Sequence, residues 1–376
     1  MPKAEAGRRT ARQSNIELLR ILAMFAIILN HSIVHGQVRF PAEAITINRL
    51  WAQLIQIPGF PGVDAFVIIS GYFLISARSV KSSRILKLWA QIFFYSILFF
   101  VLPLVFGAAD FSLRELVTRL LPVTSCRWWF ASTYFVLYLL SPFLNQLLNA
   151  FDRRQFLGFL GLFFLLWCLI PTVEGTLLQS FELFQDNHLM WFVFLYAVGA
   201  FLKRYPPRTG LSGAKLIGLA FLCMLLVFLS SVVLALLGTK KALFAQHALF
   251  LADLQMLPSL VAAVLLFLGF SRLDIGSSGL INLVSSSVFG VYLIHDDGFV
   301  NPFLWKTVFR SADFADSPFF IPRSLLVVAA VFIGCALIEL VRIHLIEKPC
   351  LPLLERIGSR IDRAREALLD RCFGKE

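Results

Sequence analysis

Long apolar segments recur along almost the whole chain, and they constrain its fold more than any other feature. A segment of about 20 apolar residues is long enough to cross the hydrocarbon core of a bilayer as an α-helix. Of the 376 residues, 58% are hydrophobic and only 15% are charged. Soluble domains are typically about 45 to 50% apolar and about 25% charged. The sequence therefore predicts an all-α polytopic membrane protein.

Ten apolar segments, bounded by charged residues or by Pro and Gly clusters, are candidate spans. They cover residues 16–34, 57–77, 86–106, 128–148, 156–172, 189–202, 213–237, 249–270, 280–300 and 322–345. An even number of spans places both termini on one side of the membrane. With that side cytoplasmic, 24 of the 34 lysines and arginines lie inside, as the positive-inside rule requires. We expect about ten transmembrane helices with both termini cytoplasmic.

The chain shows no internal repeat and no low-complexity linker. We expect a cytoplasmic tail over residues 1–14, a transmembrane domain over 15–350 and a second cytoplasmic tail over 351–376. The first apolar segment is too long for the apolar region of a cleaved signal peptide, so it stays in the mature chain. The last segment alternates apolar and charged residues and is expected to lie as an amphipathic helix on the inner leaflet.

Two classes of site find no support in the sequence. The net charge of +11 follows largely from the predicted topology, and no basic patch interleaved with aromatic residues indicates nucleic-acid binding. The six cysteines show neither a disulfide framework nor the spacing of a zinc site. No nucleic acid and no metal are therefore expected.

Arg20 and His31 lie eleven residues apart in the first apolar segment. At about 100° per residue they return to the same helix face, roughly 16 Å apart along the axis. An ionisable group at membrane depth costs about 2.5 to 3.5 kcal/mol or more, so two on one face indicate a functional site. The alternative is that each side chain snorkels to its nearer membrane surface.

The second apolar segment opens with Gly59, Pro61 and Gly62, followed directly by Asp64. Such an opening predicts irregular backbone, which is tolerated at that depth only beside protein or a water-filled cavity. We expect the Asp64 carboxylate to face His31 in the outer half of the membrane. Further on, Ser70 and Gly71 favour close helix packing.

Four cations occupy the first predicted cytoplasmic loop, on the same side of the membrane as Arg20. They are Arg78, Lys81, Arg84 and Lys87. Such a loop could cradle phosphates, although the positive-inside bias explains it equally well.

Later polar positions are also candidates. His295 ends an apolar run and precedes two carboxylates, which could favour its charged form or simply form a solvated helix end. Glu339 lies within the last span and needs a partner from another helix, whether for a structural ion pair or for function.

Together these motifs resemble the acyltransferase 3 family, ten-helix bacterial membrane acyltransferases that modify sugars of surface glycans. The resemblance runs from Asn15 to Pro349, and its most specific element is the ten-residue gap between Arg20 and His31. Other matching elements are Gly62-Val63-Asp64, Ser70-Gly71-Tyr72, Arg84 with Lys87, Trp128-Trp129-Phe130, the Phe289 to His295 stretch and Glu347-Lys348-Pro349. The chain has Lys87 where the family more often has arginine, and Ala65 where a bulky residue is common.

The resemblance implies transfer of an acyl group, most often acetyl, from cytoplasmic acyl-CoA to a sugar hydroxyl of an extracytoplasmic or lipid-linked glycan. It places the protein in the inner or plasma membrane of a bacterium, among membrane lipids. It also implies roles for particular residues: catalysis by His31 and Asp64, acyl-CoA binding by Arg20, Arg84 and Lys87, and support of the site by Ser70, Tyr72, Trp129, His295 and Glu347.

Two mechanisms and two other functions remain open. His31 could act as a general base or become transiently acylated. A glycan or acyl-donor transporter or flippase would show paired repeats with broken helices in both halves, which the sequence lacks. A non-catalytic subunit that has kept the fold is the third possibility.

Overall fold

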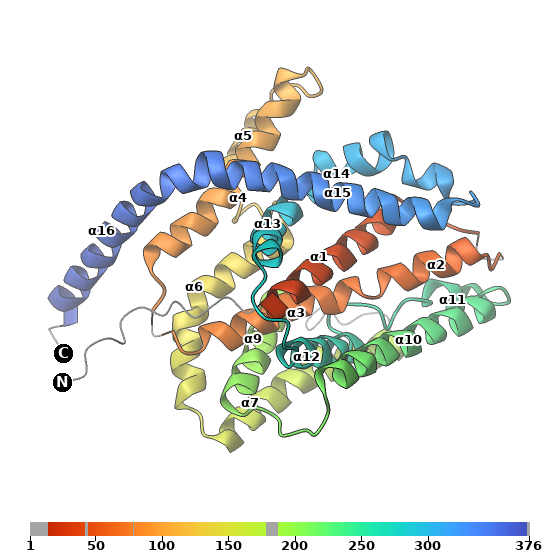
Figure 1. The fold of residues 1–376 in the computed structure, drawn as a ribbon, viewed down its shortest axis with the longest axis horizontal. Helices are drawn as coiled ribbons and strands as arrows, with labels where there is room; N and C mark the ends of the chain where they lie inside the picture. Colours follow the sequence, from red (N-terminus) through yellow and green to blue (C-terminus); the bar gives the residue numbers. More distant parts are fainter. Residues whose placement is uncertain (1–13, 42–43, 78, 178–186, 374–376) are drawn as a thin grey trace.

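The computed structural model describes residues 14–41, 44–77, 79–177 and 187–373. Regular structure in these ranges is helical throughout, and the helices pack into one bundle (Figure 1). The first half contains α1 (Ser14–Val34), α2 (Ile47–Gln56), α3 (Gly59–Leu74), α4 (Ser82–Val105), α5 (Leu113–Leu120), α6 (Trp129–Ala150), α7 (Arg153–Phe164), η1 (Leu165–Leu169) and α8 (Ile170–Leu177). The second half contains α9 (His188–Arg204), α10 (Gly213–Gly238), α11 (Ala242–Gln246), α12 (Leu257–Ser271), α13 (Gly279–His295), α14 (Val300–Pro302), η2 (Phe303–Val308), η3 (Ser311–Phe314), α15 (Phe320–Arg342), η4 (Ile343–Glu347) and α16 (Lys348–Phe373).

Each of the ten apolar segments coincides with at least one helix, so the prediction of an all-α chain is confirmed. Six helical stretches within the described ranges are long and apolar enough to cross a membrane. They are Ser14–Val34, Ile47–Leu74, Ser82–Val105, Arg153–Glu174, Gly213–Gly238 and Phe320–Cys372, with shorter apolar helices at Leu257–Ser271 and Gly279–His295. The total of ten spans and the cytoplasmic side of the termini stay predictions.

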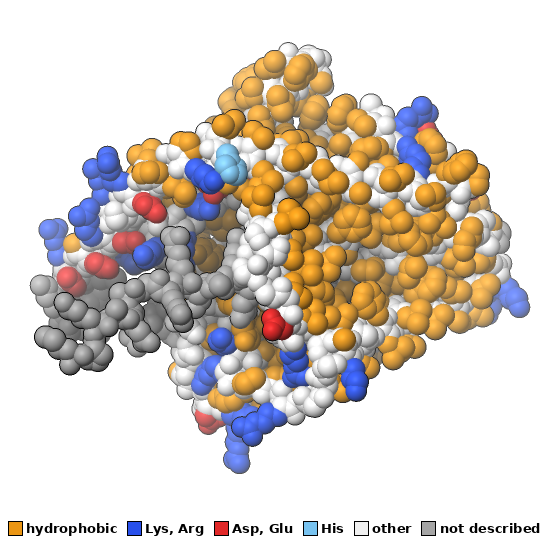
Figure 2. Space-filling model, viewed as in Figure 1, with side chains coloured by type: hydrophobic (Ala, Val, Ile, Leu, Met, Phe, Trp, Pro, Cys, Tyr) orange, Lys and Arg blue, Asp and Glu red, His pale blue; other side chains and the backbone are white. Residues whose placement is uncertain are grey.

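Hydrophobic side chains cover most of the face seen in Figure 2, whereas charged side chains gather towards its edges. Exposed leucines, phenylalanines and valines line the outer sides of α10 and α15. A soluble protein rarely exposes so large an apolar surface, because it would remain in contact with water. The protein is therefore a multi-pass membrane protein.

The centre of the bundle lies where α3 crosses α9 and packs on α1. A methyl group added at Gly71 would overlap the backbone oxygen of Tyr196, and one at Gly199 would overlap the oxygen of Ile68. Residues without a side chain let two helix backbones approach this closely. The expectation that Gly71 serves helix packing is confirmed.

The irregular backbone expected at the start of the second apolar segment lies slightly earlier than predicted. The helix is interrupted at Ile57 and Pro58, between α2 and α3, and is regular from Gly59 onward. Asn30 of α1 donates its side-chain N–H to the Gln56 carbonyl over 3.0 Å. This bond satisfies a carbonyl that the break leaves free, so protein rather than water supplies the partner.

The C-terminal helix continues from α15 through one wide turn, η4, and forms a long curved rod across the bundle (Figure 1). It begins at Lys348, slightly before the expected tail. Its Asp362 accepts hydrogen bonds from the backbone and the hydroxyl of Ser82, and Gly358 packs directly on Ser83. The tail therefore packs against the start of α4 and caps that helix.

Candidate active site

A cavity of about 270 Å³ lies inside the bundle between α1, α3, α4, α6 and α13. Arg20 and His31 both line it, together with Met24 and Ile27 from the same face of α1. The helical spacing that suggested a shared face therefore places both side chains on one internal space. Neither side chain simply points into lipid.

The Arg20 end of the cavity holds a cation with one unsatisfied hydrogen-bond donor. Arg20 Nε is buried and has no hydrogen-bond partner among the described residues. The nearby wall is polar, formed by Gln91 of α4 and by Ser285 and Ser286 of α13. A buried N–H group without an acceptor is costly, and Arg20 is cationic, so this end of the cavity suits an anionic ligand.

The His31 end is organised by a chain of hydrogen bonds that assigns its protons. His295 Nδ1 lies 2.6 Å from the Val291 carbonyl oxygen, which can only accept, so Nδ1 carries the proton. In the neutral ring, His295 Nε2 then accepts, and its partner at 3.0 Å is His31 Nδ1. His31 Nδ1 is therefore protonated, and His31 Nε2 keeps its lone pair.

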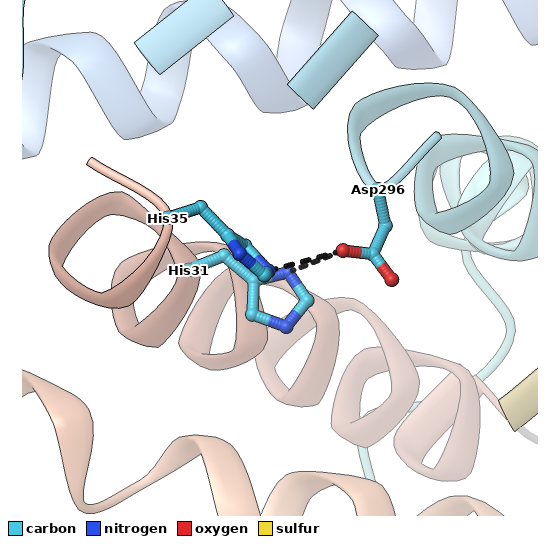
Figure 3. A group of neighbouring side chains, drawn as sticks. All are labelled: His31, His35 and Asp296. Carbon is cyan, nitrogen blue, oxygen red and sulfur yellow. Dashed lines mark ion pairs between the residues drawn. The ribbon is translucent and has the colours of Figure 1, made fainter. Parts of the chain in front are cut away.

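Asp296 closes this arrangement from the C-terminal end of α13. Its Oδ1 lies 3.1 Å from His35 Nε2 and 3.6 Å from His31 Nδ1, whereas the second nitrogen of His31 points away from it (Figure 3). Both histidine side chains therefore lie within reach of the same carboxylate oxygen.

The pairing expected between Asp64 and His31 is not formed. Asp64 is fully buried in α3 outside the cavity lining, and its Oδ1 accepts a hydrogen bond of 2.9 Å from Trp191 Nε1 of α9. The carboxylate beside His31 belongs instead to Asp296. The sequence argument failed because it compared membrane depth alone, whereas the rotation of α3 decides which helix Asp64 faces.

Of the four cations predicted in the loop before α4, Arg78 lies outside the described residues, and Lys81, Arg84 and Lys87 do not line the cavity. Arg84 is exposed beside the Tyr138 hydroxyl, and on its face of α4 the residues Leu88 and Gln91 reach the cavity. Lys87 is paired with Glu347 over 2.7 Å. The two cations therefore differ, since Lys87 already has a carboxylate partner.

Glu347 belongs to a larger ion-pair network behind the cavity. Arg342 bridges Glu347 at 2.6 Å and Glu339 at 2.7 Å. Glu339 also accepts hydrogen bonds from Gln91 and Tyr95 of α4. The expectation that Glu339 has a partner on another helix is confirmed, and the network fixes Gln91 at the cavity wall.

The remaining predicted site residues divide into two groups. Ser70 and Trp129 line the cavity, and the Ser70 hydroxyl lies 3.1 Å from the Tyr134 hydroxyl of α6. Tyr72 lies away from it, with its ring beneath Lys203 and against Phe267. The structure therefore brings Ser70 and Trp129 to the site but not Tyr72.

Three cavity or cluster residues escaped the sequence analysis: His35, Gln91 and Tyr134. His35 could have been found, because it follows His31 by four residues and so shares its helix face. Gln91 and Tyr134 carry no local signal, since polar residues of this kind occur in many membrane helices.

A buried ion pair anchors helix α5 next to this cluster. Arg119 is 2% exposed and Asp297 is 1% exposed, and they pair over 2.6 Å. Glu115 binds Arg119 and also Arg127, each over 2.9 Å. Because Asp297 follows Asp296 in the chain, this network holds α5 against the residue that contacts His31.

Comparison with known proteins agrees with this arrangement. No curated protein and no solved structure matches the chain. A family model described as an acyltransferase domain, of the acyltransferase 3 type, matches residues 13–340. Since this match covers nearly the whole chain, the protein is a membrane protein that belongs to the acyltransferase 3 family.

Proposed function

We propose that the protein transfers an acyl group, in the first instance acetyl, from acyl-CoA on the cytoplasmic side to a hydroxyl group of a glycan. The observation that carries the proposal is one cavity lined at one end by Arg20, whose buried Nε has no hydrogen-bond partner among the described residues, and at the other by an imidazole with a free lone pair. The glycan is extracytoplasmic or lipid-linked, and the membrane is the inner membrane of a bacterium.

Arg20 is proposed to bind the anionic part of the donor. A charge-assisted hydrogen bond from a buried guanidinium to a phosphate oxygen is about twice as strong as a neutral one. Arg84, which is exposed on the same face of α4 as Gln91, is proposed as a second cation for the donor phosphates. Lys87 is less suited to this role, because Glu347 already neutralises it.

His31 is proposed as the general base. The acceptor oxygen forms a bond to the acyl carbon while its proton passes to His31 Nε2. The carbon–sulfur bond then breaks, and the imidazolium returns the proton to the thiolate, which leaves as the CoA thiol. Asp296 and the His295 ring stabilise the proton on Nδ1 throughout, as a carboxylate does in other histidine-based sites.

The proposal is tested by replacing His31 with alanine in cells that express the protein. Acyl groups on the surface glycans, measured by mass spectrometry, should be lost, because a general base contributes about 10²- to 10⁴-fold in rate. The matched control is His344→Ala, which removes an exposed histidine that does not line the cavity. Immunoblotting of membranes reports insertion of both variants.

Normal acylation by an inserted His31→Ala protein would overturn the assignment. A second measurement separates the two chemical mechanisms. Purified protein mixed with radiolabelled acetyl-CoA in the absence of acceptor should remain unlabelled if His31 is a base. Label that is retained on wild type and absent from His31→Ala would instead favour an acyl-histidine intermediate.

A further inference from the structure

Three potential metal ligands converge at the outer end of α1. His31 Nδ1, His35 Nε2 and Asp296 Oδ1 all lie within 4.8 Å of one another (Figure 3). Two come from consecutive turns of the same helix face, and the third comes from the end of α13. Nothing in the linear spacing of Cys and His residues revealed this group, because the carboxylate is supplied by a distant part of the chain.

The separations match those that zinc imposes on its ligands. With metal–ligand distances of about 2.0 to 2.1 Å, neighbouring ligand atoms in a tetrahedral site are roughly 3.3 Å apart. Asp296 Oδ1 lies 3.1 Å from His35 Nε2 and 3.6 Å from His31 Nδ1. Small side-chain movements would therefore bring the three atoms into a coordination sphere.

The surroundings also suit a metal. His295 Nε2 lies 3.0 Å from His31 Nδ1 and adds a third nitrogen, and so a fourth potential ligand atom, beside these three atoms. Its Nδ1 donates to the Val291 carbonyl, which is the kind of outer contact that fixes the ring of a metal-binding histidine. His35 is 32% exposed whereas Asp296 is 11% exposed, so an ion has access past His35.

We propose that His31, His35 and Asp296 form a zinc-binding site, and that zinc bound there inhibits the protein. The inhibition rests on the proposed function, whereas the binding does not. A metal on His31 Nδ1 takes the electron pair of that nitrogen, so the single proton of the neutral ring moves to Nε2. Nε2 then has no lone pair with which to accept a proton from a hydroxyl group.

Binding is tested on the purified full-length protein in detergent by titration with cobalt chloride. Tetrahedral cobalt absorbs visible light, and one equivalent should bind. Zinc chloride should then displace it, because zinc binds such sites more tightly than cobalt. Magnesium chloride should not displace it, since magnesium prefers six oxygen ligands.

The decisive variant is His35→Gln, which removes a ligand yet keeps a side-chain N–H that can bond Asp296. Cobalt affinity should fall by at least about 10- to 100-fold, the loss that removal of even an outer-shell partner causes. His344→Gln is the matched control and should bind like wild type. Unchanged cobalt binding by His35→Gln, or no binding by folded wild type, would overturn the site.

The inhibition is measured separately, as transfer from radiolabelled acetyl-CoA to glycan in membranes that hold the wild-type protein. Micromolar zinc chloride should abolish transfer, and a chelator should restore it. His35→Gln should need at least about 10-fold more zinc for the same loss, in line with its weaker binding. Binding with undiminished transfer would reject the inhibition alone, whereas failure of His31→Ala to lose activity would reject the proposed function.

Discussion

His31 illustrates how neighbouring groups determine the chemistry of one side chain. The Val291 carbonyl fixes the proton on His295, and His295 in turn fixes the proton on His31. The lone pair on Nε2 is thus a consequence of two hydrogen bonds. The same logic makes the opposite nitrogen of His31 available to a metal.

Arg20 gives a prediction for donor binding. Arg20→Ala should raise the KM for acetyl-CoA, because it removes a guanidinium whose buried Nε has no hydrogen-bond partner within the described part of the chain. Loss of a charge-assisted hydrogen bond costs about 1.5 to 3 kcal/mol, so the increase should be roughly 10- to 150-fold. Initial rates over a range of acetyl-CoA concentrations measure it.

Arg20→Lys serves as the partner variant. It keeps the charge but not the planar fork of donors, so it should recover only part of the lost affinity. A KM for acetyl-CoA that is the same in both variants and wild type would rule out donor binding by Arg20.

The contact between helices α13 and α15 depends on a glycine, Gly290, which has no side chain. The Glu339 carboxylate lies directly on Gly290, where an added methyl group would overlap it. Gly290→Ala should therefore displace Glu339 from Gln91, Tyr95 and Arg342 and lower stability by about 1 to 3 kcal/mol. Thermal unfolding in detergent measures the loss.

The matched control for this substitution is Gly218→Ala in α10. No atom lies within 4 Å of a methyl group at that position. The control should be neutral or slightly stabilising, because alanine is the better helix former. Equal melting temperatures for both variants would contradict the packing argument.

Helix α5 gives a pH-dependent prediction. Burial raises the pKa of Glu115, but hydrogen bonds and charges from Arg119 and Arg127 more than offset it, and the pKa lies below the ordinary value. A carboxylate whose pKa is lower in the folded than in the unfolded protein stabilises the fold at pH values above its unfolded pKa. This stabilisation is lost as the pH falls through the pKa of the folded state. The wild-type protein should therefore have a higher melting temperature than Glu115→Gln at pH 7.

The difference between the two proteins should shrink as the pH falls below about 4.5, the ordinary pKa of a glutamate. Melting curves in detergent at neutral and acidic pH measure this change. A difference in melting temperature that is constant across the pH range would show that the contribution of Glu115 to stability does not depend on the charge of its carboxylate.

For the whole molecule, the orientation in the membrane is open to direct measurement with the native cysteines. Cys126, Cys350 and Cys372 are exposed. If both termini are cytoplasmic, a membrane-impermeant maleimide should label a variant retaining only Cys126 in intact cells. Variants retaining only Cys350 or only Cys372 should react only after the cells are permeabilised. The opposite pattern of labelling would show that the termini lie on the other side of the membrane.

The positions of the helices could largely be predicted from the sequence. Each of the ten apolar segments coincides with a helix, because burial of backbone N–H and C=O groups in lipid leaves the helix as the only local solution. The shared face of Arg20 and His31 followed from helical periodicity alone. Gly71 was recognised as a packing residue for a similar local reason.

The partners of particular side chains could not be predicted in the same way. Asp64 was expected beside His31 but bonds Trp191, and the carboxylate near His31 is Asp296. The depth of a residue in the membrane can be inferred from its position within an apolar segment. The rotation of one helix against another, however, depends on packing over the whole length of both helices. Such rotations decide which polar groups meet.

The sequence alone therefore established a helical membrane protein, its apolar segments and the alignment of Arg20 with His31, because these depend on hydrophobicity and on the 3.6-residue helix period. Only the tertiary structure decided that these two residues line one cavity, and that His35, His295 and Asp296 surround the imidazole. The contacts of His31 with His295 and Asp296 join residues more than 260 positions apart, and no local pattern in a chain encodes which distant helix faces will meet.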